Sequence, residues 1–246
     1  MAETTVKSFP APSAAYVVED QQRMTEARQY FQWQYSLVAP ELGQRVLEVG
    51  CGLGNFTKLY LDRELVVAID VEAECVRMLK SSLGGNKNLV CMELDVQDSS
   101  FEQLRKYQLD SIVCLNVLEH VKYDRLALSQ MQAILPVGGR VVLIVPAFDS
   151  LYGPIDTNLG HYRRYTKASL SAVAESAGLK VIQLRYMNSL GYFGWWWNAR
   201  ILKKTAQSES QIAFFDSLCV PVLSRLERLI EPPVGQSVFA VLEKSK

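Results

Sequence analysis

Short, almost wholly apolar segments recur along the middle of the chain and alternate with amphipathic ones. The apolar segments read RVLEVG, LVVAID, NLVCMELD, DSIVCLN and RVVLIVP, and a typical intervening segment reads ECVRMLKSSLGG. Continuous apolar runs of this length are typical of strands buried on both faces of a parallel sheet, and the amphipathic segments are typical of the helices that cover it. The alternation therefore predicts an α/β fold with a mostly parallel sheet.

The flanks of this alternating region add helices and two more strands. Residues 19–38 are predicted to form an aromatic-bearing helix that ends before Gly43, and the first 15 residues are predicted to lack regular structure. Thr166 is predicted to cap a helix that Gly178 terminates. Near the C-terminus, LKVIQLRYM and SVFAVLEK are predicted to be strands.

Composition and charge restrict the classes of function. The 246 residues are 49% hydrophobic, which suits a buried core, and the 26 Lys and Arg balance the 26 Asp and Glu. Because there is no basic excess, nucleic acid is not an expected partner. The five cysteines form no CxxC pair, so no metal site is expected, and the thiols are predicted to be free in the reducing cytoplasm. The N-terminal residues lack the pattern of a secretory signal, and no apolar stretch reaches the roughly 20 residues that a membrane-spanning helix needs.

A glycine-rich turn follows the first apolar run, in VLEVGCGLGNFT. Gly50, Gly52 and Gly54 allow the backbone to approach a ligand closely, and the segment after them is predicted to be a helix with free N–H groups. The spacing GxGxG differs from the GxGxxG of dinucleotide-binding turns, because Asn55 stands where a third glycine is needed. An NAD-dependent oxidoreductase is therefore disfavoured.

Acidic residues stand in or just after the first three apolar runs. Glu48 lies within the first run, Asp70 ends the second and Asp95 follows the third. The carboxyl ends of parallel strands border the crevice where open sheets bind ligands, so these carboxylates are expected to meet there. Asp70 can accept hydrogen bonds from the hydroxyls of a ribose, and Asp95 can accept one from an adenine amine.

These acids and glycines, together with Asn116–Val121 and the PVGG turn after it, resemble the class I S-adenosylmethionine-dependent methyltransferases. The resemblance implies a Rossmann-like sheet of seven strands with an antiparallel last strand, an N-terminal helical cap and a helical insertion between the last two strands. It divides the chain into a tail and cap helix at residues 1–42 and a methyltransferase domain at residues 43–246, with the insertion at 187–236.

The cofactor implied by the resemblance is S-adenosylmethionine, whose sulfonium already activates the methyl group. Glu48 and the glycines would hold its methionine part, Asp70 its ribose, and Asp95 its adenine. The full set of implied cofactor contacts is Glu48, Gly50, Cys51, Gly52, Gly54, Asp70, Val71, Asp95, Val96, Asn116, Val117 and His120.

The most polar stretch outside these motifs is GHYRRYT at residues 160–166, and similar loops occur in some bacterial members of the family. His161, Arg163 and Arg164 are predicted to be catalytic, because arginine binds carboxylates bidentately and histidine can act as a base. Alternatively, the arginines pair with a nearby acid such as Asp156 and hold the loop closed. The predicted contacts of an anionic small-molecule substrate are Tyr30, Trp33, Tyr152, His161, Arg163, Arg164 and Tyr165.

Three consecutive tryptophans, Trp195–Trp197, lie in an aromatic stretch at residues 190–204 that ends in lysines. Such a stretch suits a peripheral membrane contact or an apolar substrate. Alternatively, it packs within the molecule or against a second copy of the chain. The alternative is favoured here, because three successive side chains cannot all face one side of a helix.

Three hypotheses for the function follow. The arginine pair favours O-methylation of a small carboxylic acid to a methyl ester. The tryptophans favour methylation of a lipid-linked or apolar hydroxyl acceptor at a membrane surface. The third hypothesis is a module that binds S-adenosylmethionine without catalysis.

Overall fold

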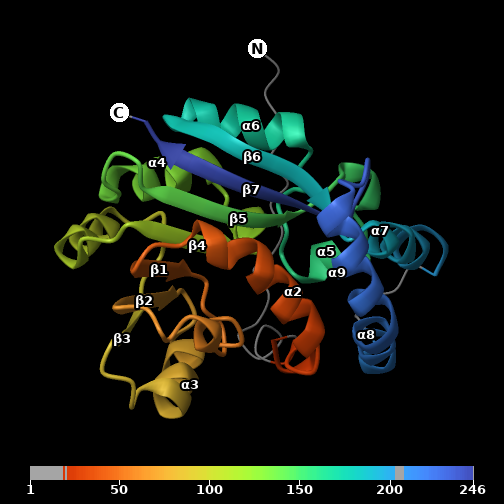
Figure 1. Ribbon diagram of the computed structural model, residues 1–246, viewed down its shortest axis with the longest axis horizontal. Helices are drawn as coiled ribbons and strands as arrows, with labels where there is room; N and C mark the ends of the chain where they lie inside the picture. Colours follow the sequence, from red (N-terminus) through yellow and green to blue (C-terminus); the bar gives the residue numbers. More distant parts are fainter. Residues whose placement is uncertain (1–18, 20, 203–207, 246) are drawn as a thin grey trace.

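Seven strands form one sheet in the order β3-β2-β1-β4-β5-β7-β6 (Figure 1). The structure is a computed structural model that describes residues 19, 21–202 and 208–245. Strand β7 runs antiparallel to both of its neighbours, whereas the pairings among β1 to β5 are parallel. The strands are β1 (Arg45–Val49), β2 (Leu65–Asp70), β3 (Leu89–Glu93), β4 (Ser111–Leu115), β5 (Arg140–Pro146), β6 (Leu179–Met187) and β7 (Ser237–Lys244). The predicted Rossmann-like sheet with an antiparallel last strand is confirmed.

Both faces of the sheet are covered, as the unbroken apolar runs predict. Leu47 of β1 packs into the core beneath α4 (Asp124–Ile134) and α6 (Lys167–Ser176). Its neighbour Val46 packs on the other face, with residues of α2 (Arg28–Val38). Since successive residues of a strand point to opposite faces, a strand between two helical layers has to be apolar at every position.

The remaining helical segments lie in the connections between strands. They are η1 (Ala39–Glu41), η2 (Thr57–Leu59), α3 (Ala73–Leu83), η3 (Ser99–Tyr107), η4 (Leu118–His120), η5 (Asp149–Leu151) and α5 (Pro154–Asn158). Between β6 and β7 come the insertion helices α7 (Ser189–Trp196), η6 (Trp197–Ile201), α8 (Glu209–Phe214), η7 (Phe215–Cys219) and α9 (Val220–Leu229). Figure 1 shows the insertion helices gathered at one end of the sheet, beside α2 and α5.

The helix predicted over residues 19–38 is interrupted, and α2 begins only at Arg28. The carboxylate of Asp216 in η7 accepts hydrogen bonds from the backbone amides of Gln29 (3.1 Å) and Tyr30 (2.8 Å). It therefore satisfies two of the free amides with which a helix begins, and its charge suits that end of the helix. An acid so distant in sequence leaves no local signal of where α2 starts.

The helix predicted after the glycine turn is also wrong, because the structure has only the single turn η2 there. Thr57 donates a hydrogen bond from its hydroxyl to Glu48, and the rings of Phe56 and Tyr60 pack in the core with centroids 5.7 Å apart. With all three side chains turned inward, the segment lacks the solvent-facing side of an amphipathic helix.

A second buried acid fixes the chain where it leaves β6. Glu227 of α9 accepts hydrogen bonds from the amides of Asn188 and Ser189, each at 2.9 Å. Asn188 has a φ of 64°, and its side chain caps α7 by accepting from the amide of Gly191 at 2.9 Å. These bonds turn α7 across the end of the sheet. Among the described residues, no helix is both long and apolar enough to cross a membrane.

The cap of α6 provides a test of the fold that is independent of function. Thr166 Oγ1 accepts from the amide of Ser169 at 3.1 Å, and Ser169 Oγ accepts from the amide of Thr166 at 2.9 Å. Replacing Thr166 with Ala removes the acceptor for the Ser169 amide and is expected to lower the free energy of unfolding by about 1 kcal/mol in urea denaturation. Thr166→Ser keeps the hydroxyl and serves as the control. Equal unfolding midpoints for the Ala variant and the unmodified protein would contradict the expectation.

Candidate functional site

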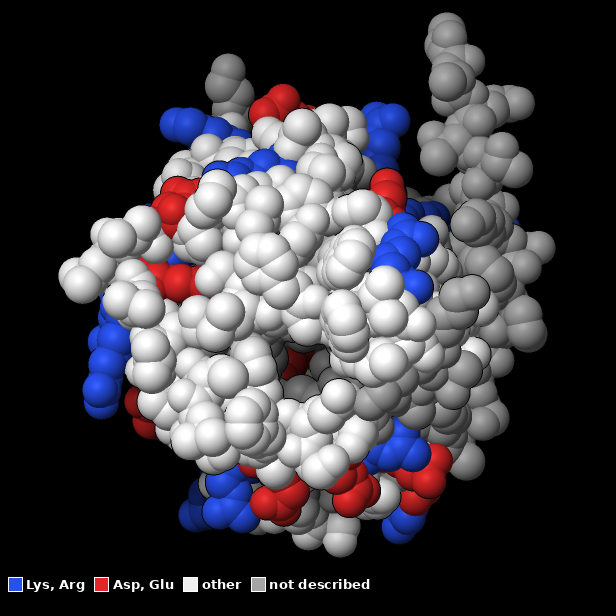
Figure 2. All heavy atoms as spheres, turned by 90° about the vertical axis from the view of Figure 1, so that its right-hand side faces the viewer, with Lys and Arg blue, Asp and Glu red and all other residues white. Residues whose placement is uncertain are grey.

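A cavity of about 1180 Å³ opens at the carboxyl ends of β1 to β4, where the strand order changes direction. Helix α2 and the insertion helices line its opposite wall. Figure 2 shows a hollow in a broad surface without charged side chains, with an acidic side chain visible inside. Small-molecule sites usually measure about 300–1,000 Å³. The cavity is therefore large enough for a cofactor and a second molecule together.

The glycine turn after β1 depends on Gly50. Its φ is +77°, and a Cβ at this position would lie 2.2 Å from the Cγ2 of Val117, which lines the cavity after β4. The amides of Gly50 and Cys51 donate to the carbonyl of Ile69 at 2.8 and 3.0 Å, which joins the turn to β2. Only glycine combines this backbone conformation with so close an approach of the β4 segment.

Two carboxylates at the edge of the cavity accept hydrogen bonds from backbone amides of the neighbouring turns and still have acceptor positions free for a ligand. Asp70 accepts from the amides of Gly52 (2.8 Å) and Glu72 (2.9 Å). Asp95 accepts from the amide of Gln97 at 2.8 Å. A carboxylate offers about four acceptor positions. Both side chains can therefore still accept hydrogen bonds from a molecule in the cavity.

Glu48 lies deeper, on β1, and is buried. Burial raises its pKa to about 7, although the hydrogen bond from Thr57 opposes this shift. A carboxyl group that titrates near neutrality responds strongly to charge, and a cationic ligand nearby would stabilise its ionised form.

All of the predicted cofactor residues line the cavity except Gly52 and Gly54. Gly54 shapes the turn from behind, since a Cβ there would lie 2.4 Å from Leu79 of α3. The structure thus brings the predicted residues to one place, and their contact with a cofactor stays a prediction.

His161 and Arg164 of the GHYRRYT loop converge on one buried carboxylate, Asp156 of α5. Asp156 Oδ1 lies 2.7 Å from His161 Nδ1 and accepts from Arg164 Nε at 2.8 Å, while Oδ2 accepts from the amide of Gly153 at 2.9 Å. Burial alone would raise the pKa of Asp156, but the bond to His161 and the charge of Arg164 hold it below its ordinary value. The guanidinium of Arg164 also lies 4.9 Å from the ring centroid of Trp195.

His120 and Glu119 complete this side of the cavity. The rings of His120 and His161 are perpendicular, with centroids 4.5 Å apart. His120 is exposed into the cavity, where desolvation by the surrounding protein and the neighbouring His161 lower its pKa and keep the ring neutral. Burial also raises the pKa of Glu119 to about 7, although His161 and Arg164 favour its charged form.

Arg163 does not line the cavity, which corrects the expectation that both arginines face a substrate. Its guanidinium donates to the carbonyls of Val121 (2.7 Å) and Lys122 (2.8 Å) and pairs with Asp124 at 3.1 Å. Adjacent residues in this extended loop point in opposite directions, so Arg163 turns outward when Arg164 turns inward.

Of the other predicted substrate contacts, Tyr30 lines the cavity and three aromatic residues do not. Tyr165 is buried and donates from its hydroxyl to Asp124 at 2.9 Å. Tyr152 donates to the carbonyl of His161 at 2.8 Å, so it shapes the loop from outside. Trp33 packs in the core between α2 and the sheet. These three side chains therefore stabilise the loop and the core, and none of them lines the cavity.

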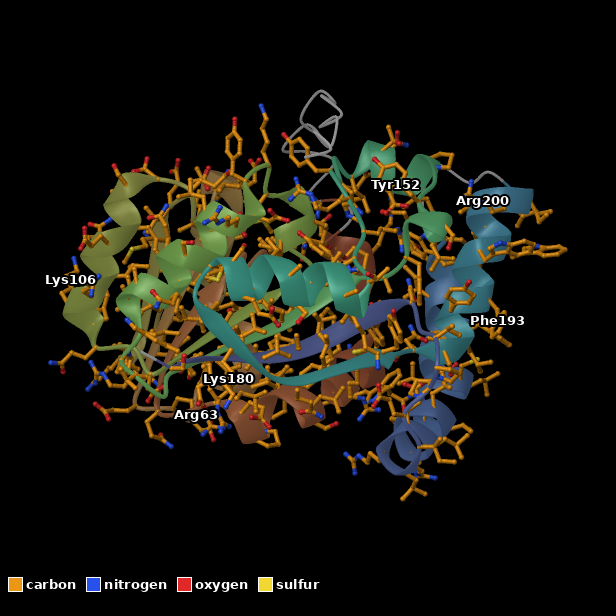
Figure 3. All side chains as sticks on the ribbon, turned by 90° about the horizontal axis from the view of Figure 1, so that it is seen from above. Arg63, Lys106, Tyr152, Lys180, Phe193 and Arg200 are labelled. Carbon is orange, nitrogen blue, oxygen red and sulfur yellow. The ribbon has the colours of Figure 1, made fainter. Side chains whose placement is uncertain are left out.

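The insertion separates the three tryptophans, as their succession along a helix requires. Trp195 lies against Arg164 and lines the cavity. Trp197 also lines the cavity while 53% exposed, and Trp196, which does not line it, is 41% exposed. Arg200 donates to the carbonyl of Ser150, and Figure 3 shows Arg200, Phe193 and Tyr152 at the same end of the molecule. Lys203 and Lys204 lie outside the described residues.

Sequence reasoning missed the amide side chains that reach the cavity from α2 and the insertion. These residues are Gln34, Asn188, Asn198, Gln211 and Gln236. None belongs to a motif, and no spacing marks them. The role of Asp156 could have been anticipated, because it was one of the acids within reach of the arginine pair.

The comparisons with known proteins agree with this geometry. Residues 19–184 match the methyltransferase domain family. A ubiquinone biosynthesis O-methyltransferase of Xanthomonas axonopodis pv. citri is 27% identical over 178 residues, which cover 66% of this chain and 72% of that protein. An uncharacterised protein of Methanocaldococcus jannaschii is 30% identical over 109 residues. That match covers 43% of this chain, which spans only 42% of that relative's length.

Among solved structures, the N-methyltransferase NodS of Bradyrhizobium japonicum with bound S-adenosyl-L-homocysteine superposes with a TM-score of 0.59. The two sequences are 15% identical, and the superposition covers 95% of this chain and 97% of NodS. At this identity the likeness shows the shared fold.

The raised pKa of Glu48 predicts a pH dependence of cofactor binding. S-adenosylmethionine carries a positive sulfonium, so it should bind better when Glu48 is ionised. That form predominates above the pKa of about 7 and is lost below it. The affinity measured by isothermal titration is therefore expected to rise about tenfold between pH 6 and pH 8 through this group. Glu48→Gln should remove this part of the pH dependence, and an equal pH dependence in both proteins would contradict it.

Proposed function

This chain belongs to the family of S-adenosylmethionine-dependent methyltransferases, and on that premise we propose that it methylates a hydroxyl group on a largely apolar small molecule. S-adenosylmethionine is the methyl donor. The observation that carries the proposal is the pairing of Arg164 with Asp156, which leaves the described cavity without a free cation.

The charges around the cavity favour a neutral acceptor over a carboxylate. Arg164 is the one Lys or Arg side chain among the described lining residues, and Asp156 neutralises it. The acids that line the cavity are Glu48, Asp70, Glu72, Asp95, Glu119 and Asp216. Such an environment suits a cationic cofactor and repels an anionic acceptor. The methyl-ester alternative depends on an arginine free to bind a carboxylate, whereas Arg164 is paired with Asp156 and Arg163 is bonded away from the cavity.

A hydroxyl acceptor has to lose its proton as the methyl group is transferred. The cavity provides polar groups suited to an acceptor oxygen at Glu119, His120 and His161, and the insertion adds aromatic and aliphatic side chains to the same lining. The bond to Asp156 fixes the orientation of the His161 ring. A similarity to an O-methyltransferase in ubiquinone biosynthesis supports the same acceptor atom.

The surface around the cavity mouth supports an apolar acceptor that arrives from a lipid phase. The insertion exposes many apolar side chains, here called the apolar collar, and three of them (Leu190, Trp197 and Phe214) also line the cavity. The collar residues are Leu190, Phe193, Trp196, Trp197, Ile201, Leu202, Phe214, Leu218, Val222, Leu226, Leu229 and Ile230. Figure 2 shows that the surface around the hollow has few charged side chains, which lie farther out. Helix α9 exposes Arg225 and Arg228 beside the collar, whereas its acid Glu227 is buried. A basic amphipathic face of this kind suits an anionic membrane surface.

The acceptor class can be tested with matched compounds. We expect methyl transfer from labelled S-adenosylmethionine to phenols or alcohols that carry an apolar tail. Carboxylic acids with the same tail should react at least tenfold more slowly, because the acidic cavity disfavours their charge. A panel in which the acids alone are methylated would overturn the hydroxyl proposal and leave the methyltransferase assignment intact.

The collar can be tested by co-sedimentation with vesicles that contain anionic lipid. Replacing both Phe193 and Trp196 with Ser removes two exposed apolar side chains that do not line the cavity. Burying one large apolar side chain contributes about 1.5–3 kcal/mol, so partial burial of two predicts a roughly tenfold or greater loss of vesicle partitioning. Ile182→Ser, an exposed position on β6, is the matched control. If the double variant and the control partition equally, the collar does not contact lipid.

A further inference from the structure

The only two histidines of the chain meet at the cavity wall. His120 follows β4 and His161 lies in the GHYRRYT loop, yet their rings are perpendicular with centroids 4.5 Å apart. Glu119, which precedes His120, lies against the same pair. One potential ligand atom from each of these three residues lies within 4.8 Å of the other two.

Each imidazole is held by a partner on one nitrogen, and the other nitrogen is left for a ligand. His161 Nδ1 is bonded to Asp156 at 2.7 Å, which leaves Nε2. His120 is hydrogen-bonded to the backbone of Leu159 through one ring nitrogen. Histidines that bind metals typically donate their second nitrogen to a carboxylate or a backbone carbonyl in this way.

Glu119 provides an independent sign that a ligand is needed. Its side chain is 1% exposed, and its Oε2 has no hydrogen-bond partner among the described residues. The nearby guanidinium of Arg164 is directed elsewhere, to Asp156 and to the carbonyl of Ala147. A buried carboxylate oxygen without a partner destabilises the fold, and a bound cation would provide the missing partner for this oxygen.

We propose that Glu119, His120 and His161 form a binding site for a divalent transition-metal ion such as zinc. Ions of this class bind imidazole nitrogen and carboxylate oxygen at about 2.0–2.2 Å, so the ligand atoms around a tetrahedral ion lie roughly 3.3–3.6 Å apart. The three atoms of the cluster lie within 4.8 Å of one another, so their side chains would have to close by up to roughly 1.5 Å around an ion. None of the five cysteines belongs to the cluster, so its ligands are nitrogen and oxygen.

Three protein ligands leave at least one coordination position open toward the cavity. Catalytic zinc sites share this composition of two histidines and one glutamate with an open position. If the acceptor is a hydroxyl, as proposed above, the ion would bind its oxygen and ease the loss of its proton. The metal site itself does not rest on that proposal, since it follows from the three side chains and their partners.

Histidine side-chain NMR provides a direct test, because the chain has two histidines and hence two imidazole spin systems. The full-length, untagged protein labelled with ¹⁵N would be titrated with Zn²⁺ and observed by long-range ¹H–¹⁵N correlation. We expect both imidazoles to shift together and to saturate at one equivalent of zinc. Zinc that leaves both imidazoles unmoved, or that moves only one, would overturn the proposal.

Variants separate this site from binding elsewhere. Glu119→Gln keeps the shape of the side chain and removes its charge, and it should weaken zinc binding at least tenfold in competition with a chelator. Glu102→Gln, the same substitution at an exposed position of η3, should leave binding unchanged. His120→Gln provides a second cluster variant should Glu119→Gln fold poorly. Equal zinc affinity in the Glu119, His120 and Glu102 variants would assign the metal to cysteines or the surface and refute the site.

The same titration distinguishes this inference from the proposed function. Zinc binding by both imidazoles in a protein that methylates no hydroxyl compound would retain the site and reject the acceptor. If the protein methylates hydroxyl compounds but its imidazole signals do not shift with zinc, the proposed acceptor class stands and the metal site is rejected.

Discussion

The buried carboxylate of Asp156 is the interaction on which the site depends. It is bonded to His161, Arg164 and the amide of Gly153, so one side chain joins the start of α5 to two cavity-lining residues of the GHYRRYT loop. An ionised group in this position has to be compensated, and the arginine and histidine provide that compensation. The loop is rich in charged residues, but Arg164, the cation among the described cavity-lining residues, is neutralised by Asp156.

This pairing decides which chemistry the cavity suits. The cofactor side is lined with carboxylates, and α2 and the insertion contribute aromatic and aliphatic side chains together with amides and Asp216. An acidic, partly apolar cavity favours a cationic cofactor and a neutral acceptor. The same loop also brings His161 against His120 and Glu119, where the partners of the rings leave one nitrogen of each for a ligand.

Two further buried acids connect the segments that form the wall of the cavity opposite the strands. Asp216 starts α2, and Glu227 fixes the entry into α7. Each satisfies helix amides that would otherwise be buried without partners. Because both acids lie in η7 and α9, the insertion and the N-terminal helix are held to each other as well as to the sheet. These bonds fix the position of the insertion, which carries the apolar collar and lines part of the cavity.

The sequence by itself determined the sheet, its order of elements and the residues at its carboxyl edge. Unbroken apolar runs have one stable environment, between two helical layers, and the residues that follow parallel strands meet at one edge by geometry. Glu48, Gly50, Asp70 and Asp95 could therefore be placed at the cavity from their positions alone.

Only the tertiary structure decided the direction of the side chains in the loops and the insertion. Arg163 and Arg164 are adjacent and chemically identical, yet one faces solvent-side carbonyls and the other a buried acid. The start of α2 and the meeting of the two histidines likewise depend on partners far away in sequence. The physical reason is that strand periodicity is a local property, whereas the neutralisation of a buried charge depends on whichever group the complete fold brings within hydrogen-bonding distance.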